Sequence, residues 1–97
     1  MSIYLTALIK SKPGYAPQMK ALLLDLVAGS TTEAACLQYD LHQGQDDENL
    51  FIFHEEWASQ AGLDEHNTQP HIQTFINSSK DIMDGEVVIY KTQPVAQ

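Results

Sequence analysis

Two histidines, His66 and His71, are the residues of this sequence best suited to acid–base chemistry. A neutral imidazole, with an ordinary pKa of ~6.5, can hydrogen-bond a phenol or take its proton near pH 7. The two lie on either side of Thr68-Gln69-Pro70, which interrupts a helical pattern, and from that break both can reach one cavity. The alternative is a pair of helix-surface histidines. Because their five-residue separation is not the helical spacing that paired metal ligands prefer, we expect no metal.

An aromatic strand precedes these histidines. Residues 50 to 57 alternate as a β-strand does, and one face carries Phe51, Phe53, Glu55 and Trp57. Trp57 is either a flat surface for a planar ligand or a core or interface residue with its indole N–H satisfied. Taken alone, Phe53 is typical of an ordinary core residue. Tyr39 is expected to share this face from a neighbouring strand and to point its hydroxyl inward, or to be a half-buried strand tyrosine.

Several other chemistries are not indicated. Cys36 has no basic neighbour in sequence that would lower the pKa of its thiol, so a nucleophilic cysteine is not supported. The sequence has no glycine-rich phosphate loop and no dinucleotide-binding motif. The acidic run at residues 45–48 lacks the ligand spacing of a calcium loop and is interpreted as a solvated turn. Redox chemistry, if present, is expected to proceed without a bound cofactor.

Length and charge restrict the class of protein. Ninety-seven residues are typical of one domain, and we treat residues 1–97 as that domain. The formal net charge of −8 repels a phosphate backbone, so nucleic acid is not an expected partner. No apolar run is long enough to cross a membrane or to act as a secretory signal, and with a single cysteine no internal disulfide can form. We therefore expect a soluble, cytoplasmic protein that does not bind membranes.

The elements that must position the site follow from periodicity and from turn residues. The predicted order is a strand at 3–10, a helix with an apolar stripe from Met19 to Val27, strands at 36–44 and 50–57 joined as a hairpin, a helical stretch from Ser59 to about Met83 broken at Pro70, and a last strand after Gly85. This order predicts an α+β fold of the ferredoxin-like βαββαβ type, an antiparallel sheet with helices on one face. The first and last strands are apolar on both faces. We therefore expect the bare sheet face to meet a second copy in a homodimer.

Short motifs along most of the chain resemble the antibiotic biosynthesis monooxygenase family. The segments that carry the resemblance are residues 33–39, Asn49, Phe51, residues 55–57, Glu65-His66 and Pro70-His71. The resemblance implies a dimeric ferredoxin-like α/β barrel with a pocket between sheet and helices in each subunit. Family members include cofactor-independent oxygenases of quinols and polycyclic phenols, haem-degrading enzymes, and proteins that process a quorum-sensing signal.

The resemblance also assigns individual residues. Trp57 matches the family tryptophan at the end of the third strand, and His66 and His71 match the pocket histidines of quinol-oxygenase-like members. Ala35 stands where the family has glycine, which affects the local turn. Phe53 stands where polyketide-oxidising members have asparagine, so their substrate and mechanism are not transferred. Haem is not expected, because the first-strand asparagine and second tryptophan of the haem-degrading members are missing.

The leading hypothesis is a cofactor-independent monooxygenase that oxidises a small quinol or phenol with molecular oxygen. His66 or His71 would be the catalytic base, and Tyr39, Phe53 and Trp57 would bind the aromatic ring. Two alternatives remain: a non-redox isomerase or processing enzyme for a small carbonyl signal compound, and a dimer that binds aromatic ligands without catalysis.

Overall fold

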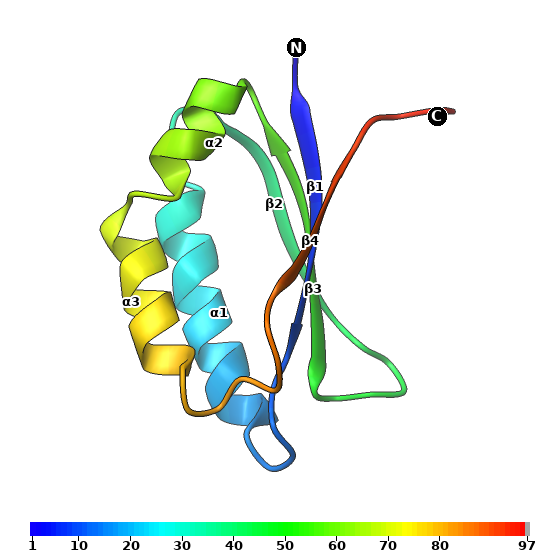
Figure 1. The fold of residues 1–97 in the computed structure, drawn as a ribbon, viewed down its shortest axis with the longest axis vertical. Helices are drawn as coiled ribbons and strands as arrows, with labels where there is room; N and C mark the ends of the chain where they lie inside the picture. Colours follow the sequence, from blue (N-terminus) through cyan, green and yellow to red (C-terminus); the bar gives the residue numbers. More distant parts are fainter. Residues whose placement is uncertain (97) are drawn as a thin grey trace.

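The computed structural model describes residues 1–96 and places seven elements along them (Figure 1). In chain order they are β1 (Ile3–Lys10), α1 (Ala16–Ser30), β2 (Cys36–Gln43), β3 (Leu50–Trp57), α2 (Gln60–His66), α3 (Pro70–Ser79) and β4 (Val88–Thr92). The predicted βαββαβ order is confirmed, with the second helical segment divided at Pro70 as expected. The bounds predicted for β1 and β3 are confirmed as well.

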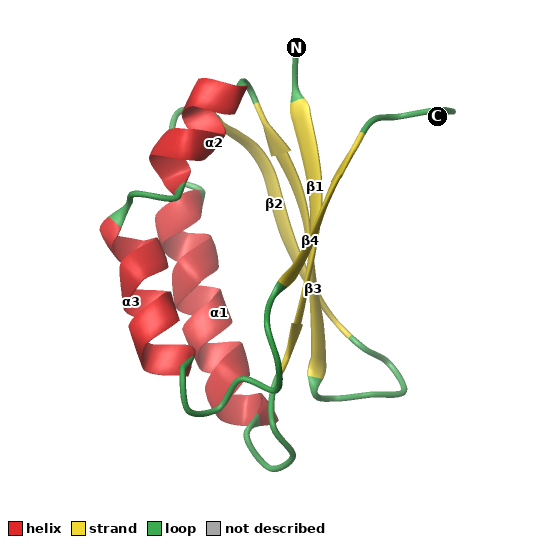
Figure 2. Ribbon diagram, in the orientation of Figure 1, coloured by secondary structure: helices red, strands yellow, loops and turns green. Residues whose placement is uncertain are grey.

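The four strands form one antiparallel sheet in the order β2-β3-β1-β4. All three helices lie on one side of this sheet, as Figure 2 shows. The side chains of β1 that face the helices, Leu5, Ala7 and Ile9, are buried, and those between them are only half-buried. The strand alternation therefore defines a core face and a bare face, which is the predicted α+β architecture.

α1 covers much of the core face because its apolar side chains recur at helical spacing. Gly14, with a φ of +87°, makes the turn after β1, and Pro17 occupies the first helical turn, where its missing N–H needs no partner. Met19, Leu23 and Leu26 point into the core and are almost completely buried. After α1 ends at Ser30, the chain enters the turn that leads to β2.

The expected helix end near Met83 is wrong, because α3 ends at Ser79. The amides of Ile82 and Met83 both donate to the carbonyl of Ser79, and these bonds close a turn. Met83 then forms an isolated antiparallel bridge with Ser11, beside the end of β1. A long-range backbone contact thus overrides the local helical pattern and brings the chain back to the sheet for β4.

The turn before β2 accommodates Ala35 in place of the expected glycine. No non-glycine residue among those described has a positive φ, so this position does not require glycine for its backbone conformation. The Ala35 methyl group instead packs against the backbone of Gly62 in α2, where an added Cβ would collide with it. Close packing between this turn and α2 is therefore achieved by a glycine on the helix.

The bare sheet face keeps large apolar side chains in solvent. Val88 and Tyr90 of β4 are 46% and 56% exposed, and they pair in register with Leu8 and Thr6 of β1.

None of the helices described within residues 1–96 has the length and apolar character needed to cross a membrane.

Candidate active site

α2 carries the first site histidine at its last position. Ser59 has extended backbone angles, and its hydroxyl accepts a hydrogen bond of 3.0 Å from the Gly62 amide, which caps the helix. Leu63 and His66, three positions apart, face inward together and are buried. The capped helix therefore fixes His66 in the protein interior, where the residue is only 3% exposed.

α3 begins at Pro70 and carries the second histidine in its first turn. Gln69 precedes it with extended backbone angles, as the residue before a proline prefers. The His71 ring lies directly against Gly29 near the end of α1, where an added Cβ would lie 2.6 Å from His71 Cγ. A close approach between α1 and α3 thus holds this ring, and it needs a residue without a side chain at position 29.

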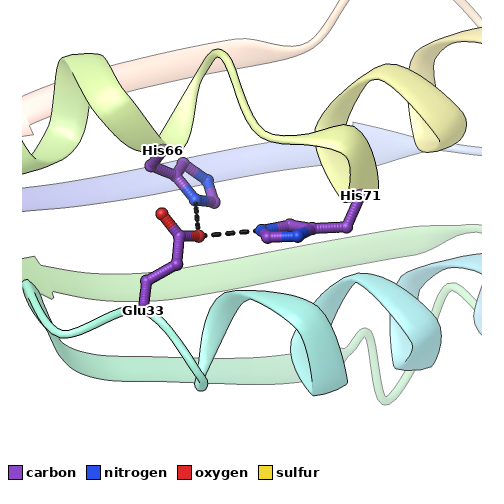
Figure 3. A group of neighbouring side chains, drawn as sticks. All are labelled: Glu33, His66 and His71. Atoms are coloured by element: carbon purple, nitrogen blue, oxygen red, sulfur yellow. Dashed lines mark hydrogen bonds and ion pairs between the residues drawn. The ribbon is translucent and has the colours of Figure 1, made fainter.

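Glu33 joins the two histidines into one cluster. Its Oε2 atom lies 2.6 Å from His66 Nδ1 and 2.8 Å from His71 Nε2 (Figure 3). The carboxylate comes from the turn after α1 and lies between the two rings, which belong to α2 and α3. Both histidines therefore contact one carboxylate, but of the two only His66 is among the residues that line the cavity described below. Sequence reasoning missed Glu33, and the signal available was only its place in the family-like segment 33–39.

This contact determines which nitrogen of each ring is available. A carboxylate oxygen only accepts hydrogen bonds, so His66 Nδ1 and His71 Nε2 carry the protons that face Glu33. A neutral His66 then has its lone pair on Nε2. His66 also lines the cavity described below, and Nε2 is the ring nitrogen that Glu33 leaves free for a ligand there.

Burial keeps His66 neutral. Loss of hydration lowers the pKa of this imidazole below its ordinary value of 6.5, and the neighbouring His71 lowers it further. The hydrogen bond and the charge of Glu33 act in the opposite direction and raise this pKa, but the effect of burial is the larger. His66 is thus a neutral, oriented imidazole at pH 7, the form that can accept a proton.

Trp57 is completely buried and supports the site from behind. Its ring centroid lies 4.3 Å from that of His66, and its Nε1 donates a hydrogen bond of 2.9 Å to Glu55 Oε1. The core interpretation of Trp57 is therefore the one that the structure supports, with the indole N–H satisfied. The tryptophan holds two polar side chains in place.

Glu55 is a second acid at the site that the sequence patterns did not indicate, and unlike Glu33 it is buried. It is 7% exposed, and burial raises the pKa of its carboxyl group, whereas the hydrogen bond from Trp57 lowers it. A glutamate on the apolar face of a predicted strand was the available signal, since such a position rarely carries an unpaired charge.

The cavity lies between the sheet and the helices and has a volume of about 530 Å³. The predicted residues Tyr39, Phe53 and His66 line it together with Glu55, while most of its remaining lining is apolar. The Tyr39 ring lies 4.5 Å from that of Phe53 and 5.7 Å from that of His66, between centroids. Burial and the charge of Glu55 raise the pKa of the Tyr39 hydroxyl, which therefore stays protonated. The cavity is large enough for a single aromatic ring system.

The remaining candidates lie elsewhere or are unsuited to catalysis. His42 and His54 are exposed on the bare sheet face, with ring centroids 5.1 Å apart. Burial, Glu33 and Glu55 raise the pKa of the Cys36 thiol, which makes this cysteine a poor nucleophile.

Comparison with known proteins places this chain in a family. The family model described as "Antibiotic biosynthesis monooxygenase" matches residues 2–78, and the chain belongs to that family. The crystal structure of PA3566 from Pseudomonas aeruginosa superposes with a TM-score of 0.92 at 36% identity, covering 98% of this chain and 95% of that one.

Two curated relatives have similar sequences. "Putative monooxygenase YcnE" of Bacillus subtilis is 31% identical over 91 residues, which cover 94% of this chain and 96% of the relative. "Uncharacterized protein sll1783" of Synechocystis is 32% identical over 85 residues, which cover 86% of this chain but only 58% of that protein. The family and the name of the Bacillus relative together support a general monooxygenase-like function.

Proposed function

We propose that the protein is a cofactor-independent monooxygenase that oxidises a small quinol or phenol, with His66 as its base. The observation that carries the proposal is the Glu33–His66 contact of 2.6 Å, which leaves Nε2 free as the acceptor of a buried imidazole that lines a largely apolar cavity. A carboxylate that fixes the tautomer and orientation of a histidine is a recurrent arrangement for general-base catalysis.

The reaction needs no external reductant. His66 Nε2 takes the proton of a substrate hydroxyl, and the resulting phenolate can pass an electron directly to oxygen. For a simple hydroquinone, one oxygen atom enters the ring and the other leaves as water, so that hydroquinone and O₂ yield hydroxyquinone and H₂O. The four electrons that oxygen accepts all come from the substrate.

The other site residues act in two groups. Tyr39 and Phe53 contact the ring of the substrate, and Glu55 offers its second carboxyl oxygen as a polar partner in the cavity. His71 and Trp57 are positioning residues, because His71 contacts Glu33 and Trp57 has no exposed surface. We assign the base to His66 rather than to His71 because His66 is among the residues that line the cavity and His71 is not.

Oxygen consumption with a panel of hydroquinones tests the proposal. Uptake should require protein above the autoxidation blank and should fall at least ~100-fold in His66→Ala, since a positioned base contributes about 10²–10⁴-fold. Glu33→Gln should lower kcat, whereas Glu48→Gln, at an exposed glutamate, should leave it unchanged. Uptake that is unchanged in His66→Ala would show that this histidine is not the base.

A non-redox isomerase is the second candidate, and one observation favours it. Glu55 and His66 line the same cavity, and their environments shift the pKa values in opposite directions, raised for the acid and lowered for the imidazole. Such a pair can donate and accept protons at two carbons of a carbonyl compound. This function predicts turnover under anaerobic conditions, which the oxygenase does not. Binding of aromatic compounds with no turnover in either assay would favour a ligand-binding protein.

We also propose that two chains associate through the bare sheet faces. Leu8, Val88 and Tyr90 would supply the apolar centre of this interface, because they share one face across β1 and β4. Light scattering should give twice the chain mass for the native protein and the monomer mass for Tyr90→Asp. A native monomer would contradict this proposal.

A further inference from the structure

We propose that Glu33, His66 and His71 form a binding site for a divalent metal ion of the zinc type, and that the ion switches which ring nitrogen of His66 carries the proton. Binding itself is independent of the proposed function. Only the resulting inhibition of the oxygenase rests on it.

The donor set fits such an ion. The three ligand atoms, one carboxylate oxygen and two imidazole nitrogens, lie within 4.8 Å of one another. Three protein ligands of this kind with one position left for water are typical of zinc sites that exchange ligands. The same two-histidine, one-carboxylate set also suits other first-row divalent metals.

Binding requires a rearrangement of the side chains. Ligand atoms at ~2.0–2.1 Å from a tetrahedral ion lie roughly 3.3 Å apart. Glu33 Oε2 is now closer than that to both nitrogens, at 2.6 and 2.8 Å, and all three ligand atoms lie within 4.8 Å of one another, so the carboxylate withdraws and the two rings approach each other as the ion enters between them. Glu33 can do this because it lies on the turn between α1 and β2 rather than inside an element.

The site is both held in place and reachable. His66 is fixed by its contact with Trp57, and its side chain is 4% exposed, whereas the side chains of Glu33 and His71 are 12% and 20% exposed. An ion can therefore enter from the side of His71. The net charge of −8 also favours the approach of a cation.

Binding has a consequence in the cavity. The ion binds His66 Nδ1 in place of the proton that this nitrogen donates to Glu33; that proton is released to water, and Nε2 takes up a proton from water. A neutral His66 then carries its proton on Nε2, which becomes a donor and no longer accepts a proton from a substrate. The ion would inhibit general-base catalysis without entering the cavity.

Titration of metal-free protein with Co²⁺ or Zn²⁺ alone tests binding. We expect one ion per chain and, for Co²⁺, the intense visible absorption of a tetrahedral site. Glu33→Gln and His71→Asn should weaken affinity more than ~100-fold, since loss of even an outer-shell partner lowers it 10–100-fold. His54→Ala should not weaken it. Equal affinity in all variants, or no binding by the native protein, would overturn the site.

Gly29→Ala keeps all three ligands but pushes the His71 ring away, and it should weaken binding also. Thermal unfolding of each variant confirms that a loss of affinity does not reflect loss of the fold.

Nitrogen-15 NMR of the imidazoles tests the switch without any assay of turnover. His66 should be protonated on Nδ1 in the metal-free protein and on Nε2 with Zn²⁺ bound. Zinc binding that leaves the proton of His66 on Nδ1 would refute the switch, and zinc-bound protein with full oxygen uptake would refute the inhibition.

Discussion

Trp57→Phe separates packing from hydrogen bonding at the centre of the site. Trp57 is fully buried, and its Nε1 is the donor to Glu55 Oε1 at 2.9 Å. Phenylalanine keeps an aromatic ring against His66 but removes this donor and some volume. The buried carboxyl group of Glu55 then loses its hydrogen-bond partner.

The expected magnitude follows from these two losses. An unsatisfied buried acceptor destabilises the fold by about 1–3 kcal/mol, and the space left by the smaller ring adds to that loss. We expect the free energy of unfolding to fall by roughly 2–4 kcal/mol in total. For a domain of this size each ~1 kcal/mol lowers Tm by about 4–8 °C, so the fall in Tm is on the order of 15 °C.

A double-mutant cycle in urea measures the hydrogen bond by itself. Trp57→Phe should destabilise the native background more than a Glu55→Met background, with a coupling energy of about 1–2 kcal/mol. A coupling energy below ~0.5 kcal/mol, the size of ordinary deviations from additivity, would refute the claim that Trp57 holds Glu55.

Three further perturbations test the same structure. The acidic limb of the pH profile of kcat/KM should lie below pH 6.5, because burial lowers the pKa of His66. Glu33→Gln should move that limb to lower pH, since it removes the group that raises this pKa. A pH–rate profile of each protein measures both effects. Glu55 binds a proton more readily in the folded than in the unfolded chain, so the free energy of unfolding should fall as the pH rises above 4.5. Urea titrations should show a weaker fall for Glu55→Gln than for the native protein. Gly62→Ala should lower Tm, because the added methyl group collides with the side chain of Ala35. Adding Ala35→Gly should restore most of the lost Tm. A double variant as unstable as Gly62→Ala alone would contradict the close packing of these two residues.

The sequence alone was sufficient for the order of the elements, for the bounds of β1 and β3 and for part of the cavity. The period-two pattern of β3 predicts its bounds and places Phe53 on the core face, and register across the hairpin brings Tyr39 to that face, as observed. Pro70 divides the helical stretch because a proline is accepted in a first helical turn but not inside a helix. These features depend on neighbours within a few residues, which a local pattern contains.

Tertiary structure decided the chemistry of the site. Glu33 meets His66 and His71 from 33 and 38 positions away, and no periodicity connects these residues. Trp57 could have been a ligand surface or a core residue, and only the packing of α2 over the sheet buries it behind His66 and Glu55. Sequence patterns report which side chains share a face of their own element, whereas the distances between atoms of different elements are set by how those elements pack. Those distances orient His66 for the base role proposed above and place His71 on the same carboxylate.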